Sequence, residues 1–202
     1  MVMEPFSVVS GPAAPLMRRD VDTDVIIRVE RLNLPRSELG RWALEPLRGP
    51  DFILDQPMFR GAPILLAGAN FGCGSSREHA VWALRGHGIR CVVAPSYGDI
   101  FFSNCFQNGM LPVALPEATI MSLAEQAGGG AAITVDLQRC VVIAPDGTQH
   151  TFAIDPIRRE MLLAGADELG LTLRRALEIA AWQRADAVKR PWAVTRPERI
   201  TL

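Results

Sequence analysis

The fold class is decided by residues 64–114, which read ILLAGANFGCGSSREHAVWALRGHGIRCVVAPSYGDIFFSNCFQNGMLPVA. Three short apolar runs predict strands, and two amphipathic patterns predict helices between them. In chain order these elements are 64–67, 76–85, 91–94, about 99–107 and 111–114. Strands that alternate with helices form a parallel sheet with right-handed crossovers. We therefore predict an α/β fold with a parallel βαβαβ core, in which Pro112 makes the last strand short or places it at an edge.

The flanking sequence predicts further elements. Before the core we expect a strand end at 25–27 and a short helix at 36–44, and after it a helix at 116–126 and a half-buried strand at 133–137. The turn residues Pro145-Asp146-Gly147 predict a hairpin between 140–144 and 149–154, so the chain adds antiparallel strands. A helical period from Leu171 to Ala187 predicts a helical tail, which ends in the proline-containing stretch 190–202.

Composition argues against several classes of function. The chain has 202 residues, of which 49% are apolar, and its 21 basic side chains are balanced by 22 acidic ones. Because the charge is balanced and no block of Lys or Arg occurs, we expect no nucleic-acid partner. The apolar runs are far shorter than the roughly 20 residues of a membrane span. The N-terminus also lacks the residue order of a signal peptide, so we predict no membrane association and a cytoplasmic location.

The loop at 68–79 reads GANFGCGSSREH and joins a predicted strand to a predicted helix, which is where α/β proteins bind ligands. Ser75 and Glu78 have the spacing of a capping box. A cap alone requires neither the glycines nor Arg77, a cation in the first turn, where the helix dipole disfavours it. We predict an anion site made of free backbone N–H groups and the Arg77 guanidinium. The loop matches neither the dinucleotide motif nor the P-loop, so the expected anion is a carboxylate.

The four cysteines, at positions 73, 91, 105 and 140, have none of the close spacings of zinc or cluster ligands. We therefore expect no metal on this chain. Cys73 has an alternative role as a nucleophile with His79 or His87 as its base, because a helix N-terminus lowers the pKa of a thiol. That alternative makes the protein a Cys73-dependent hydrolase.

A second polar cluster at 18–27 reads RRDVDTDVII and places three acids before an apolar run. The glycine and the distant glutamate of a calcium loop are missing. Two interpretations stay open: a solvated turn with Asp capping, or an Asp that orients the arginine or a serine of the other motif.

Together these motifs resemble the small subunits of 3-isopropylmalate dehydratase, in the aconitase superfamily. The resemblance is carried by DTDVII at 22–27, NFGCGSSREHA at 70–80, GDIF at 98–101, NGMLP at 108–112 and GLTL at 170–173. It implies that residues 1–202 form a single swivelling β/β/α domain with a helical C-terminal tail from about 171. It also implies a separate large subunit as partner, which carries a [4Fe-4S] cluster, while this chain holds no cofactor.

The resemblance further implies a hydro-lyase of leucine biosynthesis that isomerises 2-isopropylmalate to 3-isopropylmalate by dehydration and rehydration. Ser75 is then the base that removes the proton, while the partner's iron polarises the departing hydroxyl. Ser76 and Arg77 bind a carboxylate of the hydroxy-dicarboxylate substrate. Asp24, on the Thr23-Asp24 turn, matches the acid that orients the site's arginine or serine.

The chain departs from the family pattern at 28–40, which reads RVERLNLPRSELG, where many members have a basic segment containing Thr-Gly beside the substrate's variable group. The substrate of a related hydro-lyase, of the citraconate/methylmalate, dimethylmalate or homoaconitate type, is therefore an alternative. A subunit that only stabilises or regulates its partner is a second alternative, since it needs neither Ser75 nor Arg77.

Overall fold

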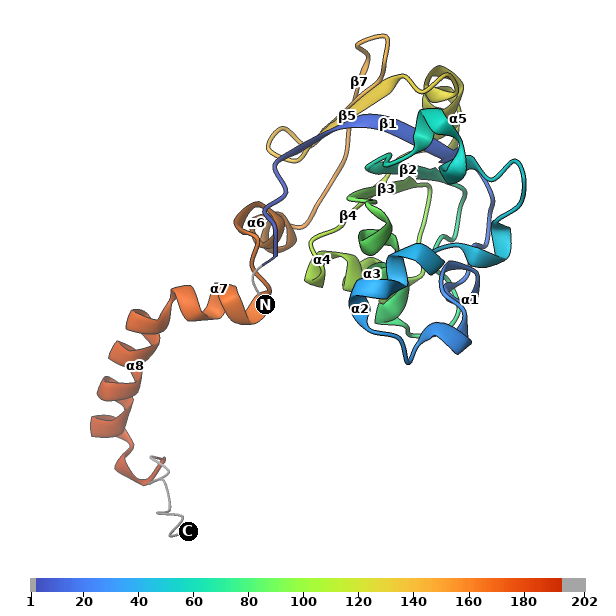
Figure 1. Cartoon of the computed structure of the whole chain (residues 1–202). Helices are drawn as coiled ribbons and strands as arrows, with labels where there is room; N and C mark the ends of the chain where they lie inside the picture. Colours follow the sequence, from blue (N-terminus) through green and yellow to red (C-terminus); the bar gives the residue numbers. More distant parts are fainter. Residues whose placement is uncertain (1–2, 194–202) are drawn as a thin grey trace. The chain divides into compact units, whose positions relative to one another are not determined.

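The computed structural model describes residues 3–193. The chain divides into two units, Met1–Asp167 and Glu168–Leu202. The first unit contains a seven-stranded sheet in the order β4-β3-β2-β1-β5-β6-β7 (Figure 1). The strands are β1 (Val8–Leu16), β2 (Ile64–Ala67), β3 (Cys91–Ala94), β4 (Leu111–Ala114), β5 (Ala132–Asp136), β6 (Val141–Ile143) and β7 (Gln149–Thr151). The helices of this unit are α1 (Thr23–Ile26), α2 (Arg36–Leu39), α3 (Glu78–His87), α4 (Asp99–Gln107), α5 (Glu117–Ala127) and α6 (Pro156–Ala164).

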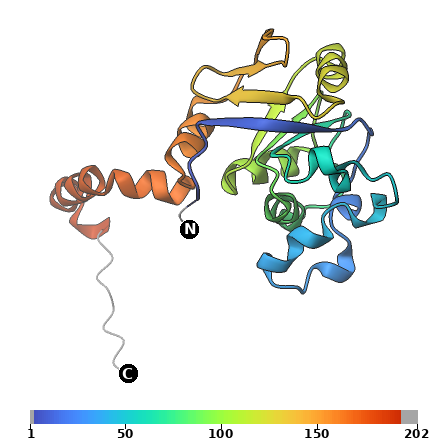
Figure 2. The ribbon, with the colours of Figure 1, turned by 45° about the horizontal axis from the view of Figure 1, so that its top comes forward.

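Strand pairing confirms the predicted α/β class. Strands β1 to β4 are parallel to one another, and the helices α3 and α4 connect β2 to β3 and β3 to β4. Strand β4, which contains Pro112, has four residues and lies at the edge of the sheet, as predicted. Beyond β1, the strands β5, β6 and β7 are antiparallel, which confirms the hairpin around 145–147 (Figure 2).

The central strand β1 is absent from the sequence-based prediction. Its sequence, VVSGPAAPL, contains two prolines, which normally exclude a residue run from a central strand. The register explains why they are tolerated. Residues 8–12 pair with β5 on one side and residues 13–16 pair with β2 on the other, so each proline has a neighbour on one side only. Strand β1 thereby joins the antiparallel and parallel parts of the sheet.

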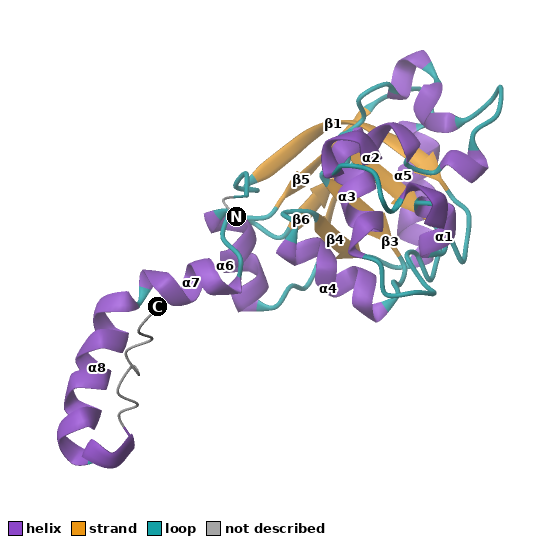
Figure 3. Ribbon diagram, turned by 60° about the horizontal axis from the view of Figure 1, so that its bottom comes forward, coloured by secondary structure: helices purple, strands orange, loops and turns teal. Residues whose placement is uncertain are grey.

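Strands β2 and β3, in the parallel part of the sheet, are buried on both faces, which explains why they are continuous apolar runs, whereas β5 alternates buried and more exposed residues. In β2, Leu65 and Ala67 contact the hydrophobic cluster that includes residues of α1, α2 and α3, whereas Ile64 and Leu66 contact the cluster that includes α5. This alternation follows from the two-residue period of a strand. Helices α1, α2 and α3 therefore lie on one face of the sheet and α5 on the other (Figure 3).

Two predicted elements before the core are wrong in type or length. The expected strand end at 25–27 is instead the short helix α1, because the Asp22 carboxylate accepts from the N–H of Val25 at 2.7 Å and caps a helical turn. The expected helix at 36–44 ends at Leu39 and continues only as a 3-10 turn, Gly40–Trp42. Other 3-10 turns of this unit are Val29–Arg31, Glu45–Leu47, Ile53–Asp55 and Pro57–Phe59.

The second unit contains α7 (Glu168–Arg174), α8 (Ala176–Lys189) and the 3-10 turn Pro191–Ala193. Residues 194–202 of the predicted proline-containing end lie outside the described residues. The prediction that the whole chain forms a single swivelling domain with a helical tail stays a prediction. Within 3–193, no helix is long and apolar enough to cross a bilayer.

Candidate functional site

Three loops meet where the neighbouring parallel strands β1, β2 and β3 end. The middle loop, after β2, is hydrogen-bonded through its backbone to the other two. Toward the loop after β1, Gly72 donates to Val21 at 2.7 Å and Cys73 accepts from Thr23 at 2.9 Å. Toward the loop after β3, the Phe71 backbone donates to Ser96 at 3.1 Å and accepts from Gly98 at 2.9 Å. The motifs at 20–24, 70–77 and 96–98, far apart in sequence, thus form one surface at the carboxyl edge of the sheet.

Two glycines of this surface are required by close packing. Gly72 has a φ of +72°, and a Cβ on it would lie 2.2 Å from Cγ of Phe101. A Cβ on Gly98 would lie 2.5 Å from the carbonyl oxygen of Gly72. Gly74 differs, because a Cβ there would meet nothing closer than 3.4 Å and the residue is exposed. Only Gly74 therefore leaves its backbone open to a ligand, while the other two let the loops approach one another.

The structure brings together the predicted site residues Thr23, Asp24, Ser75 and Arg77. Arg77 Nη1 donates to Asp24 Oδ1, and the Arg77 side chain is 18% exposed against 53% for Asp24. Buried Thr23 donates from Oγ1 to the carbonyl oxygen of Ser75 at 3.0 Å. In the acidic cluster, Asp22 caps α1 and Asp24 forms an ion pair with Arg77. That Asp24 orients the arginine for a ligand stays a prediction.

The two serines face solvent next to this ion pair. Ser75 and Ser76 are exposed, and within the described part of the chain their hydroxyls have no hydrogen-bond partner. Because the Thr23 contact fixes the Ser75 backbone, the hydroxyl projects from an anchored position. The arrangement can present a guanidinium and two free hydroxyls to one ligand, which matches the predicted carboxylate site in residue types.

The predicted capping box is wrong. Helix α3 begins at Glu78, two residues later than expected, and its N-cap is Arg77 in an extended conformation without a side-chain cap. The Glu78 carboxylate does not reach back to Ser75 but accepts from Nδ2 of Asn108 at 2.7 Å. Arg77 therefore precedes the first turn of the helix, so its position conflicts less with the helix dipole than the sequence indicates.

The geometry disfavours the alternative of a Cys73 nucleophile. Burial, followed by the negative charges of Asp22 and Asp20, raises the pKa of the Cys73 thiol, which is the opposite of activation. The two histidines that were candidate bases have other contacts: the His87 ring nitrogen Nδ1 lies 3.1 Å from the Gly40 carbonyl oxygen, and the His79 ring lies against Trp82.

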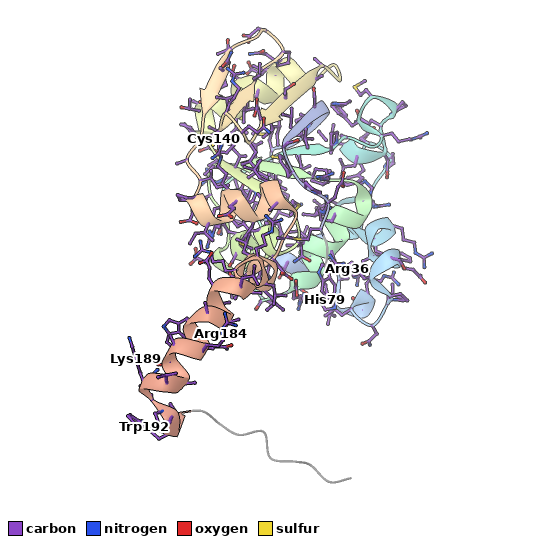
Figure 4. All side chains as sticks on the ribbon, turned by 90° about the vertical axis from the view of Figure 1, so that its left-hand side faces the viewer. Arg36, His79, Cys140, Arg184, Lys189 and Trp192 are labelled. Carbon is purple, nitrogen blue, oxygen red and sulfur yellow. The ribbon has the colours of Figure 1, made fainter. Side chains whose placement is uncertain are left out.

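A buried amide, which no sequence motif indicates, links α3 to α2 and α4. Asn108 donates to Glu78 and to the carbonyl of Asn104, and its Oδ1 accepts from Trp82 Nε1 and Arg36 Nη2, both at 2.9 Å. All four hydrogen-bonding positions of the amide are thus used. The side chains of Arg36 and His79, labelled in Figure 4, both contact the Trp82 ring. Residue types alone could not reveal this network, because its members are up to 72 positions apart.

The same combination of fold and loops occurs in a known family. A family model described as the aconitase C-terminal domain matches residues 3–118, and a second one, LeuD_N, matches residues 118–156. The chain belongs to the family of aconitase C-terminal domains.

Individual relatives narrow this assignment. The chain is 48% identical to the 3-isopropylmalate dehydratase small subunit of Paramagnetospirillum magneticum, over 94% of this chain and 100% of that protein. It is 49% identical to the subunit of the same name from Rhodospirillum centenum, over 95% of this chain and 100% of the relative. The crystal structure of 3-isopropylmalate dehydratase (leuD) from Methanocaldococcus jannaschii matches with a TM-score of 0.69 and 26% identity, over 86% of this chain and 99% of that one. Within the aconitase family, the chain therefore belongs to the 3-isopropylmalate dehydratase small subunits, which confirms the resemblance of its motifs.

Proposed function

We propose that this chain is the small subunit of a two-subunit hydro-lyase that isomerises 2-isopropylmalate to 3-isopropylmalate in leucine biosynthesis. The relatives' names support the reaction and the subunit role. The observation that carries the proposal on this chain is the Arg77–Asp24 pair beside exposed Ser75 and Ser76, at the carboxyl edge of a parallel sheet.

In this proposal Ser75 moves the proton. The Ser75 oxygen takes a proton from the carbon next to the hydroxyl-bearing carbon, the C–H electron pair forms the alkene, and the hydroxyl departs with the C–O electron pair. Rehydration returns a proton and a hydroxyl to the exchanged carbons. A serine hydroxyl is a very weak acid, so the neighbouring guanidinium and N–H groups must stabilise its anion.

Arg77 and Ser76 bind and orient the substrate. One N–H of the guanidinium is occupied by Asp24, which leaves other donors of the fork for a substrate carboxylate. Because Asp24 restricts the rotation of this guanidinium, a bound carboxylate holds the reacting carbon at a fixed place relative to Ser75. Asp24 and Thr23 are thus positioning residues in this proposal, since each acts through another group.

The partner in this proposal is a separate large subunit, which completes the site over the exposed serines. By the family resemblance, that subunit carries a [4Fe-4S] cluster. The described residues of this chain do not fit such a group, because they bring no three His, Cys, Asp or Glu side chains together, and burial raises the pKa of Cys91 and Cys105. We also propose a single swivelling domain, no nucleic-acid partner and a cytoplasmic location; the four unpaired cysteines support the last of these.

The test is an anaerobic assay that follows alkene absorbance with 2-isopropylmalate. It compares this chain alone, its large subunit alone and the mixture. We expect activity only in the mixture, and a loss of about 100-fold to 10,000-fold with Ser75→Ala. Ser122→Ala, an exposed serine of α5, is the matched control and leaves the rate unchanged.

Each rival function gives a different result. Activity of this chain alone, abolished by Cys73→Ala, contradicts the proposal and favours the hydrolase. Full activity of mixtures that contain Ser75→Ala or Arg77→Ala favours a subunit that only stabilises its partner. A mixture that is inactive on isopropylmalate but active on citraconate or another hydroxy-diacid precursor keeps the reaction class and changes the substrate.

A further inference from the structure

A second polar site lies at the opposite end of α3 from Ser75. It is a cavity of about 500 Å³. Its polar lining consists mainly of Glu4, Arg36, Trp82, Arg85, Arg90 and Asn108. Three guanidinium groups thus face one carboxylate. The volume is within the range of small-molecule sites, roughly 300–1,000 Å³.

Two of the three arginines are held in place. The Arg36 Nη2 donates to Asn108 Oδ1 at 2.9 Å, and its guanidinium carbon lies 4.8 Å from the centroid of the Trp82 ring. The Arg90 Nη1 lies 2.5 Å from Glu4 Oε2, and its Nη2 donates to the Pro5 carbonyl at 3.2 Å. The Arg90 side chain is only 17% exposed, and its Nε is buried without a hydrogen-bond partner. The cavity therefore presents cations whose positions are fixed before any ligand arrives.

The third arginine, Arg85, lacks a local counter-ion contact. Within residues 3–193 its guanidinium donates no hydrogen bond and forms no ion pair, although the side chain is partly buried. Burial and then the positive charge of Arg90 lower the pKa of Arg85, Glu4 opposes them, and Arg36 adds a smaller lowering effect. The charged form of Arg85 is thus disfavoured in this cavity, so an anion there removes an unfavourable interaction as well as adding contacts.

The C-terminal end of α3 carries partial negative charge, which opposes an anion. Two of its last carbonyls are capped, because the N–H of Gly88 donates to Arg85 and the N–H of Ile89 donates to Leu84, both at 3.0 Å. Against these partial charges, the arginines that line the cavity bring full positive charges.

We propose that this cavity binds a small dianion, a phosphate or a short dicarboxylate, between the guanidinium groups of Arg36, Arg85 and Arg90. Arg85 is separated from the Arg77 end of α3 by roughly 12 Å along the helix axis, so this site is distinct from the one that carries the proposed function. The proposal of this second site can be tested independently of the proposed function, because binding of a dianion is measured without turnover.

The experiment is a calorimetric titration of the full chain at fixed ionic strength, with phosphate in one arm, malonate in a second and chloride as the blank. The chain carries Arg77→Gln throughout, so that the loop at 68–79 contributes no arginine. We expect saturable one-site binding of at least one dianion. Arg85→Gln weakens it by about tenfold or more, and Arg85→Lys weakens it less.

Arg60→Gln is the matched control, because Arg60 is exposed on another loop and the charge change is the same. Thermal unfolding of each variant checks that it folds, and the dianion raises the midpoint less in Arg85→Gln than in the chain that retains Arg85. Binding of phosphate but not malonate, or the reverse, supports the site and identifies its ligand class. Absence of saturable binding, or equal weakening by Arg60→Gln and Arg85→Gln, overturns the proposal. It is likewise overturned if Arg85→Gln leaves binding intact but weakens association with the large subunit, since the cavity then receives an acidic side chain of that partner.

Discussion

The two ends of helix α3 place arginines in opposite electrostatic settings. At the beginning, Arg77 is paired with Asp24, beside an anchored Ser75. At the end, Arg85 has no ion pair among the described residues, and two further arginines line the same cavity with one glutamate. An arginine held by an acid is oriented for a ligand but has part of its charge neutralised. An arginine surrounded by other cations is destabilised until an anion arrives.

Asn108 connects these two ends. Its amide donates to Glu78, the first residue of α3, and accepts from Arg36 at the cavity. Both sites therefore share one rigid support, although each has its own arginines. The charge-balanced pair at the beginning of α3 is oriented for a substrate, whereas the excess of positive charge at the end of α3 favours binding of an anion.

The largest effect, on kcat/KM, is expected at the Arg77–Asp24 ion pair. Arg77→Ala lowers kcat/KM of the assembled enzyme by about 100-fold to 1,000-fold, because the carboxylate loses its bidentate partner. Asp24→Asn lowers it by about tenfold, since the guanidinium remains but is less restricted. Steady-state kinetics of the two variants and of the double variant measure both effects, with Asp55→Asn on an exposed turn as control. Additive losses in the double variant contradict a role of Asp24 through Arg77.

The loop surface at the beginning of α3 also depends on glycine. Gly72→Ala destabilises the fold by about 3 kcal/mol, because it combines backbone strain at positive φ with overlap against Phe101. Urea unfolding measures the change. Gly129→Ala is the control, since a Cβ there meets nothing within 4 Å and its φ is not positive. Equal midpoints for the two variants would falsify the packing argument.

Because Asn108 contacts both Glu78 and Arg36, its replacement should affect both ends of α3. Asn108→Ala lowers the free energy of unfolding by about 2 kcal/mol, because it leaves the partly buried Trp82 N–H and Glu78 carboxylate without their partner. It also weakens dianion binding several-fold, since Arg36 loses its tether. Urea unfolding and the phosphate titration measure these effects against exposed Asn33→Ala. If Asn108→Ala leaves the phosphate affinity unchanged, the cavity does not depend on Asn108, and the idea of a shared support for both ends of α3 is wrong.

The smallest effect concerns the one acid of the cavity. Glu4→Gln tightens phosphate binding by a few-fold, because Glu4 competes with the ligand for Arg90. The hydrogen bond and charge of Arg90 hold the pKa of Glu4 below its ordinary value of 4.5. Glu4 therefore stabilises the fold above pH 4.5, and this contribution is lost as the pH falls through the lowered pKa. Unfolding curves between neutral and acid pH should show a smaller loss of stability in Glu4→Gln than in the parent and in the Glu160→Gln control.

Much of the fold was predictable because of where its strands lie. Strands buried on both faces must be apolar throughout, so β2, β3 and β4 stand out as runs without any knowledge of their partners. Strand β1 was missed because its two prolines are acceptable only where the strand changes neighbours. The helix α1 was mistaken for a strand because its β-branched residues favour strands, and the Asp22 cap overrides that preference.

The sequence by itself determined the sheet's parallel core, the family, and the chemistry of the loop motifs, since each of these is written in neighbouring residues. The tertiary structure alone decided that α3 begins at Glu78 and that Asp24 reaches Arg77. It also decided that arginines at 36, 85 and 90 line one cavity. The physical reason is range: strand and turn preferences act between adjacent residues, whereas ion pairs and cavities form between side chains that only the folded sheet brings together.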